Sequence, residues 1–212
     1  MEIDIIFDTV CPWCFIGKKR LERALALRPH LAPSLNWKPF LLNPEMPPGG
    51  IDRTAYLIKK FGSEARINHM YGTLGEAGQS VEIDFAFERI GKTPNSVDSH
   101  RLLLFAARHG LADDIAEALF MEFFINGRDT GDIGILVDIG EAHGLDGDDL
   151  EAYLESPDDV ETIYDLNVQA HRLGINGVPA FSFNGKFLIS GAHEPQVLAR
   201  MLDAAQATEN AA

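Results

Sequence analysis

The sequence predicts an α/β fold in which one β-sheet, built from both ends of the chain, is interrupted by an inserted helical lobe. The first 45 residues have the pattern of a β-α-β unit, and a hairpin with a final helix follows only after a long run of amphipathic segments. The late hairpin can complete the sheet that the first strands begin. We therefore expect one discontinuous domain from 1–45 and 158–212, with an inserted helical domain at 46–157.

Three consecutive patterns indicate the β-α-β unit. Residues 3–7 are almost wholly apolar, which is typical of a central strand buried on both faces. From Pro12 onward apolar residues recur at helical spacing, and Pro29 ends the helix. Residues 35–42 then have the composition of a second strand, and Pro39 within them favours a position at the edge of the sheet or a bulge in the strand.

The character of the chain changes after a loop rich in Pro and Gly at 43–52. Five amphipathic stretches typical of helices follow, at 53–70, 95–109, 112–125, 132–143 and 147–154. Toward the C-terminus the pattern predicts a helix at 158–172, strands at 180–183 and 187–190 around the turn signal Asn184-Gly185, and a last helix from Pro195. The Ala-rich tail after this helix is expected to fray.

Composition and charge argue against several classes of function. At 212 residues and 46% hydrophobic, the chain can bury one core with a helical lobe but not two full domains. Its 18 basic and 32 acidic residues give a net charge of -14, which opposes binding to nucleic acid and to anionic membranes. The N-terminal run is acidic where a signal peptide is basic and is too short to span a membrane, so a cytoplasmic protein is expected.

The two cysteines of the chain, Cys11 and Cys14, are three positions apart in a Cys-Pro-Trp-Cys run. They fall between the first strand and its helix, where unpaired N–H groups and the positive end of the helix dipole stabilise a thiolate. Cys11 is thus the predicted nucleophile toward a disulfide-containing protein or a small thiol or disulfide, and Cys14 the predicted resolving thiol. Pro12 suits the first helical turn, and Trp13 presents an apolar face to a substrate.

The same spacing also occurs in zinc sites. Zinc needs two further ligands, and none of the seven histidines lies within ten residues of Cys11 or Cys14 or forms an HxxxH pair. No metal site is therefore predicted. A merely structural disulfide would stay open in a reducing compartment, which leaves redox chemistry as the interpretation.

A second candidate site is the Val178-Pro179 pair, which comes immediately before the returning strand. A cis peptide before Pro179 would turn the Val178 backbone outward, so that its N–H and C=O could pair with an extended substrate beside Cys11. From frequency alone, an ordinary trans turn proline is the alternative.

Several segments together resemble the FrnE-like branch of the DsbA family. They are FDTVCPWCFIG at 7–17, WKPFLLNP at 37–44, TPNS at 93–96 with HRL at 100–102, and GINGVP at 174–179. The resemblance covers the whole chain in order. It implies a thioredoxin-like fold with an inserted helical domain, dithiol–disulfide exchange at the CxxC, a cis Pro179 and frequently a homodimer.

The wider superfamily also contains 2-hydroxychromene-2-carboxylate isomerases and kappa-class glutathione transferases, which resemble this fold, use glutathione, and carry serine where Cys11 stands. Keeping both cysteines argues against pure transferase chemistry, but it leaves glutathione open as a reductant or mixed-disulfide partner. No permanently bound cofactor is expected. By analogy, Asn43 and Ser190 would hold a peptide or glutathione, although loop and capping roles explain both residues equally well.

The residues around the dithiol also bear on its redox poise. Strongly oxidising DsbA depends on a very low thiolate pKa, and Trp13 supplies no positive charge, so we expect a mostly reduced dithiol that acts as a reductase or isomerase. His100 is not assigned to the site, because packing explains a lone helical histidine as well as catalysis does. Two alternatives stay open: a glutathione-dependent isomerase or transferase acting on a small aromatic metabolite, and a metal-binding or chaperone-like module.

Overall fold

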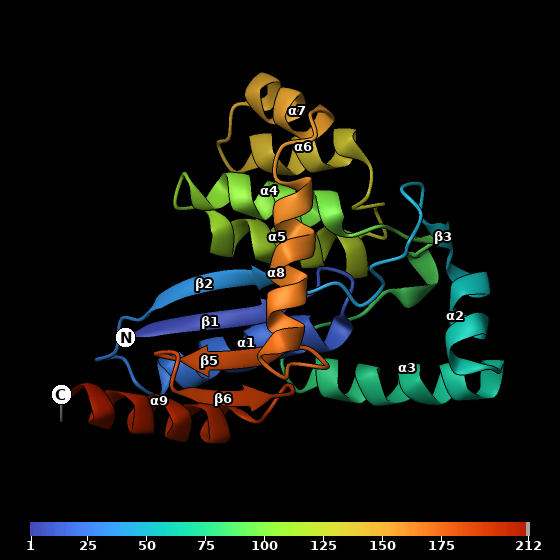
Figure 1. The fold of residues 1–212 in the computed structure, drawn as a ribbon. Coiled ribbons are helices and arrows are strands. Elements are labelled where there is room, and N and C mark those ends of the chain that lie inside the picture. Colours follow the sequence, from blue (N-terminus) through green and yellow to red (C-terminus); the bar gives the residue numbers. More distant parts are fainter. Residues whose placement is uncertain (211–212) are drawn as a thin grey trace.

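The computed structural model describes residues 1–210, which form a four-stranded sheet surrounded by helices (Figure 1). The strand order is β2-β1-β5-β6. Strand β1 (Glu2–Phe7) pairs in parallel with β2 (Ser34–Pro39) and antiparallel with β5 (Ala180–Phe183), and β5 pairs antiparallel with β6 (Phe187–Ser190). The predicted fold class is confirmed, because the β-α-β start and the late hairpin join in one sheet.

The first helix connects β1 and β2 and carries the cysteines. Helix α1 (Pro12–Ala26) begins with Cys11 as its N-cap and Pro12 in its first turn, where the missing N–H of proline costs nothing. Strand β2 lies at the edge of the sheet and ends at Pro39, as its proline indicated.

The C-terminal hairpin and helix also follow the sequence pattern. Asn184 and Gly185 have φ values of 52° and 64°, the left-handed conformation that a tight hairpin requires. Helix α9 (Pro195–Asn210) packs against α1. The predicted fraying is wrong as far as Asn210, because the Ala-rich segment is a good helix former and Ala205 is fully buried. Ala211 and Ala212, the end of that tail, lie outside the described residues.

The middle of the chain is helical, as predicted, with two differences. Its helices are α2 (Arg53–Phe61), α3 (Glu64–Gln79), α4 (Val97–Ala107), α5 (Ala112–Phe124), α6 (Ile133–Ala142), α7 (Gly147–Glu155) and α8 (Val160–Arg172). The single helix expected at 53–70 is two helices, because Gly62 adopts a left-handed φ of 84° and Ser63 caps α3. The sequence also gave no sign of the short pair β3 (Ile51–Asp52) and β4 (Lys92–Thr93), or of a 3₁₀ turn at Phe87–Arg89.

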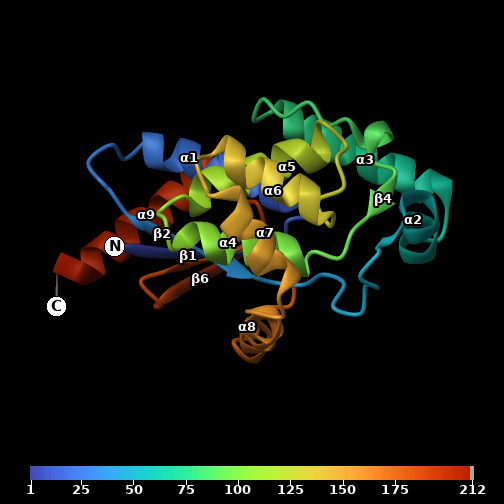
Figure 2. The same ribbon diagram turned by 90° about the horizontal axis from the view of Figure 1, so that it is seen from above.

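The helices are arranged around the sheet in three groups (Figures 1 and 2). Helices α1 and α9 cover one face and α8 lies on the other, whereas α4 to α7 stack beyond the β2 edge. Helices α2 and α3 form an arm beside the carboxyl end of β1. The dithiol therefore lies where the sheet, the helical stack and this arm come together.

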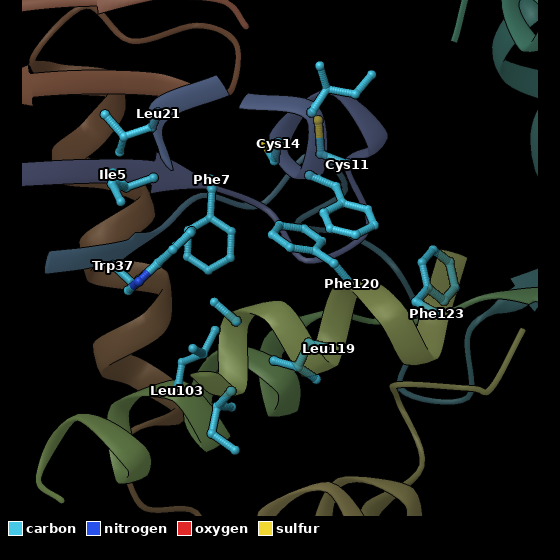
Figure 3. Packing of buried hydrophobic residues seen from close by; sticks show 14 of the residues in the cluster. Ile5, Phe7, Cys11, Cys14, Leu21, Trp37, Leu103, Leu119, Phe120 and Phe123 are labelled. Atoms are coloured by element: carbon cyan, nitrogen blue, oxygen red, sulfur yellow. The ribbon is translucent and has the colours of Figure 1, made fainter. Parts of the chain in front are cut away.

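One hydrophobic core runs from the sheet into the helical stack. Phe7 of β1 contacts Trp37 and Phe120 edge-to-face (Figure 3). Phe15 of α1 stacks on Phe120 of α5 with ring centroids 5.1 Å apart. The cluster continues to Leu150 in α7. This core is continuous across the boundaries predicted for the inserted domain and so does not mark them. These boundaries stay a prediction.

Within residues 1–210, no helix combines the length and apolar character needed to cross a membrane.

Candidate active site

The two cysteines lie at the start of α1 and are both buried. Cys11 is 4% exposed and Cys14 2% (Figure 3). The Cys14 N–H donates to the Cys11 carbonyl at 3.0 Å, and the two thiols interact with each other. The Cys11 N–H donates to the carbonyl of Asp8 at 3.1 Å, which fixes the loop between β1 and α1. The predicted pair is thus a compact dithiol at the N-terminus of a helix.

The environment of Cys14 raises the pKa of its thiol well above the ordinary value. Burial is the main cause, followed by a hydrogen bond and charge interaction with Cys11, and the charge of Asp8 acts in the same direction. A backbone hydrogen bond at Asp8 opposes the shift without reversing it. Cys14 therefore remains a protonated thiol at neutral pH, a state suited to a resolving cysteine that waits for a mixed disulfide.

The loop before β5 closes over Cys11. The Val178–Pro179 peptide is cis, which confirms the expectation from resemblance. The Cys11 thiol donates to the Val178 carbonyl with a sulfur–oxygen distance of 3.7 Å. The Val178 N–H has no hydrogen-bond partner within the described chain. The structure therefore brings Val178 and Pro179 against the dithiol, with one backbone donor still unused.

Close packing between α1 and this loop depends on Gly17. A Cβ atom built on Gly17 would lie only 2.8 Å from Cγ of Pro179 and 3.2 Å from Cζ of Phe181. A glycine at this position is thus needed for α1 to approach the proline loop.

A buried carboxylate that the sequence analysis missed lies beside the dithiol. Asp8 is 0% exposed, and its Oδ2 accepts from the Leu42 N–H at 2.7 Å. Its Oδ1 is 3.6 Å from Nε2 of His100, which is also 0% exposed. Among residues 1–210, neither ring nitrogen of His100 has a hydrogen-bond partner. The signal available in the sequence was an acidic residue between an apolar strand and the CxxC.

The arginine next to His100 has a structural role. Arg101 is 2% exposed and donates to four backbone carbonyls at 2.5 to 2.9 Å, those of Tyr153, Leu154, Ser156 and Asp158. It thus holds the connection between α7 and α8 against α4. In the His100-Arg101 pair, only the histidine faces the dithiol region.

Asn43 lies in a cavity of about 440 Å³ between the loop after β2 and helix α2. Its Oδ1 accepts from the Tyr56 hydroxyl at 2.9 Å, and that hydroxyl accepts from Nζ of Lys60 at 2.7 Å. Lys59 also lines this cavity. A smaller neighbouring cavity shares the Tyr56 and Lys60 side chains with it and is lined by Pro12. Glu45 also lines the larger cavity, so Asn43 belongs to a groove with two lysines and one glutamate, next to the smaller cavity that reaches Pro12.

The structure shows no direct contact between Ser190 and the dithiol, whereas Trp13 lies between the two cysteines in the chain. Ser190 pairs with Ala180 at the end of β6, and the following Gly191 N–H donates to the Pro179 carbonyl at 2.7 Å. The Ser190 side chain is exposed, and no hydrogen bond joins it to Cys11 or Cys14 in the described structure. Trp13 is half-buried against the main core.

No group of three or more His, Cys, Asp or Glu side chains suited to a metal ion occurs in the part of the chain that the structure describes.

A profile of the DSBA-like thioredoxin domain matches residues 2–203, nearly the entire chain. The chain belongs to this family. The resemblance to the DsbA family seen in the sequence is confirmed, and the family makes the chain an enzyme with thiol–disulfide oxidoreductase activity.

Individual relatives cover almost the same length. The uncharacterized protein YwbO of Bacillus subtilis (strain 168) is 29% identical over 197 residues, which cover 91% of this chain and 90% of YwbO. The crystal structure of the probable DsbA oxidoreductase SCO1869 from Streptomyces coelicolor is similar with a TM-score of 0.89 and 27% identity, covering 98% of this chain and 90% of that one. The cytosolic disulfide reductase DsbM from Pseudomonas aeruginosa, solved with GSH, shares the fold with a TM-score of 0.68, 17% identity, and coverage of 99% and 98%.

Proposed function

We propose that this DsbA-like oxidoreductase works as a disulfide reductase or isomerase in which Cys11 is the nucleophile and Cys14 resolves the mixed disulfide. The observation that carries the proposal is the asymmetry of the pair. Cys11 caps α1 and contacts the Val178 loop, whereas Cys14 lies within α1 and keeps its proton. A substrate sulfur that approaches the loop meets Cys11 first.

The exchange follows two balanced displacements. The Cys11 thiolate attacks one sulfur of a substrate disulfide, forming a mixed disulfide and releasing the other substrate sulfur as a thiolate that takes a proton from water. Cys14 then loses its proton and attacks the Cys11 sulfur, which releases the second substrate thiolate. The substrate gains two electrons, and the enzyme is left with a Cys11–Cys14 disulfide. In an isomerisation the released substrate thiolate attacks again, and no net electrons move.

The free Val178 N–H supports binding of an extended peptide or a small disulfide next to Cys11. A substrate backbone carbonyl can accept from this donor while its sulfur faces Cys11. The half-buried ring of Trp13 adds apolar surface beside the same position. Pro12 and Pro179 then shape the two sides of the approach.

Glutathione is the proposed reductant of the enzyme disulfide. Its two carboxylates suit Lys59 and Lys60, which line the groove of Asn43 together with Glu45. The GSH bound by DsbM supports the same co-substrate. Two molecules of glutathione would reduce the Cys11–Cys14 disulfide and leave as glutathione disulfide. Cytoplasmic location and a homodimer complete the proposal and stay predictions.

Insulin reduction driven by dithiothreitol tests the roles of the two cysteines. Wild type should accelerate reduction, and Cys11→Ser should abolish the effect. Cys14→Ser should accumulate a mixed disulfide on Cys11 that mass spectrometry detects, because resolution is blocked. A Cys11→Ser protein that still reduces insulin, or a Cys14→Ser protein that traps nothing, would contradict the assignment.

The reducing poise needs a separate measurement. Equilibration of the dithiol with glutathione buffers should give a potential between those of thioredoxin and the glutaredoxins, about -270 to -200 mV. A value as oxidising as that of DsbA, about -120 mV, would rule out a reductase.

Survival of a glutathione-dependent conversion of a small aromatic compound in Cys11→Ser would instead favour the isomerase or transferase alternative.

A further inference from the structure

A third cavity, on the arm formed by α2 and α3, contains a buried arginine that the dithiol chemistry does not use. The cavity has a volume of about 500 Å³, within the range of small-molecule sites. Arg53 forms part of its wall and is 8% exposed. Arginine is almost never buried to this degree without an anionic partner.

Arg53 has no such partner in the described structure. Within residues 1–210, no carboxylate lies within ion-pair distance of its guanidinium, whose single hydrogen bond runs from Nη1 to Oγ1 of Thr93 at 3.2 Å. Its Nε is buried and unpartnered. Glu64 and Glu88 line the same cavity, but both are exposed to solvent and neither pairs with Arg53. The buried positive charge is therefore uncompensated, a costly arrangement for a protein interior.

The position of Arg53 in its helix adds to this cost. It is the first residue of α2, where the positive end of the helix dipole disfavours a cation. The preceding Asp52 uses its side chain to accept from the Ala55 N–H and leaves Arg53 unpaired. A bound anion would neutralise the guanidinium, interact favourably with the helix dipole, and give the unpartnered Nε an acceptor.

The rest of the cavity wall is suited to an apolar group. Its lining includes Leu57, Ile67 and Ile90, together with the rings of Tyr71 and Phe87. These two rings are stacked with centroids 4.3 Å apart and an angle of 8° between their planes. A bare inorganic anion would leave this apolar surface in water, whereas an organic acid would cover it.

We propose that this cavity binds a small organic carboxylate, with the carboxylate on Arg53 and an apolar, preferably flat, body along the wall of Tyr71 and Phe87. Arg53 is well suited to this role because its planar guanidinium can bind both oxygens of a carboxylate. This ligand site is additional to the thiol–disulfide exchange and does not depend on it.

The site has a direct structural link to the dithiol. Arg53 also lines the small cavity that reaches Pro12, so the same side chain forms a wall of both spaces. A ligand bound to Arg53 would therefore be separated from the approach to Cys11 only by the Arg53 side chain.

Three probes on the full chain test the proposal by calorimetry and thermal unfolding. They are 4-phenylbutyrate, the neutral 4-phenylbutan-1-ol, and inorganic phosphate. We expect 4-phenylbutyrate to bind and raise the unfolding temperature, and the alcohol and phosphate each to bind at least about tenfold more weakly. This comparison needs no variant, so it stands even if Arg53 is needed for folding.

Two variants and a control locate the site. Arg53→Met should weaken 4-phenylbutyrate by at least about tenfold and leave the alcohol unchanged, since only the carboxylate contact is lost. Ile67→Trp should fill the cavity and abolish binding. Arg200→Met removes the same charge from the exposed face of α9 and should change nothing.

Four results would overturn the inference. They are no binding of 4-phenylbutyrate at millimolar concentration, equal binding of acid and alcohol, phosphate binding as tight as that of the acid, and unchanged acid affinity in folded Arg53→Met or Ile67→Trp protein.

Discussion

Replacing Gly17 by alanine should damage the active site although alanine is the better helix former. The added methyl group would lie 2.8 Å from Cγ of Pro179, 3.3 Å from its Cβ and 3.2 Å from Cζ of Phe181. Ordinary carbon contacts begin near 3.5 Å, so α1 and the proline loop must separate by about 0.7 Å. Neither neighbour can yield easily, because the Pro179 ring is rigid and Phe181 is fully buried.

The magnitude follows from two opposing effects. Gly→Ala within a helix stabilises by about 1 kcal/mol, and overpacking a filled core costs about 1–3 kcal/mol. The matched control is Gly72→Ala in α3, where a Cβ would meet nothing within 4 Å, so only the favourable effect applies. Gly17→Ala should therefore be less stable than Gly72→Ala by about 1–3 kcal/mol, the cost of overpacking alone.

The same displacement should slow disulfide exchange. Cys11 Sγ is 3.7 Å from the Val178 carbonyl, and a further separation of about 0.7 Å breaks that contact and moves the unused Val178 N–H away from the substrate. Misplacements of this size cost up to about 100-fold in rate, so we expect a loss of roughly tenfold to 100-fold in single-turnover reduction of a model disulfide.

Urea unfolding and single-turnover exchange measured on wild type, Gly17→Ala and Gly72→Ala check both parts. Gly72→Ala should gain stability and keep wild-type rates. If Gly17→Ala is as stable as Gly72→Ala and exchanges disulfides at the wild-type rate, the close approach of α1 to the proline loop does not position Cys11, and the reasoning fails.

Three further changes give separable results. Asp8→Asn removes a charge that raises the pKa of the Cys14 thiol, so thiolate absorbance of Cys14 in a Cys11→Ser background should appear at lower pH, and an unchanged midpoint would contradict the geometry. Arg101→Ala leaves four backbone carbonyls without their hydrogen-bond donor and should lower the free energy of unfolding by about 3 kcal/mol or more in urea titration. Arg101→Lys should restore only part of this lost stability. Burial raises the pKa of Cys14 in the folded state above its pKa in the unfolded state, which is near 8.5. The protonated thiol therefore favours folding below about pH 8.5, and this contribution to stability is lost as the pH rises toward the folded-state pKa. The reduced wild type should therefore lose stability relative to Cys14→Ala as pH rises above about 8.5, and parallel curves would refute it.

Some features could be predicted from the sequence because they depend only on residues that are close together in the chain. Cys11, Pro12 and Cys14 could be placed at a helix start because the preceding run is apolar and the following residues repeat at helical spacing. The hairpin at Asn184-Gly185 could also be predicted, because the conformation of the turn depends on these two residues themselves. The division of 53–70 into two helices was missed, although Gly62 and Ser63 are a cap signal, because the apolar periodicity continues across them.

The dithiol, its place at the start of a helix and the class of chemistry it performs could be predicted from the amino-acid sequence, because each depends on residues within one or two helical turns. The groups that surround the dithiol became known only from the folded chain. Cys11 meets Val178 across 167 positions, Asp8 faces His100 from another element, and Arg53 is buried without a counter-ion. Such contacts depend on how the sheet, the helical stack and the α2–α3 arm pack together, and no local spacing encodes that packing.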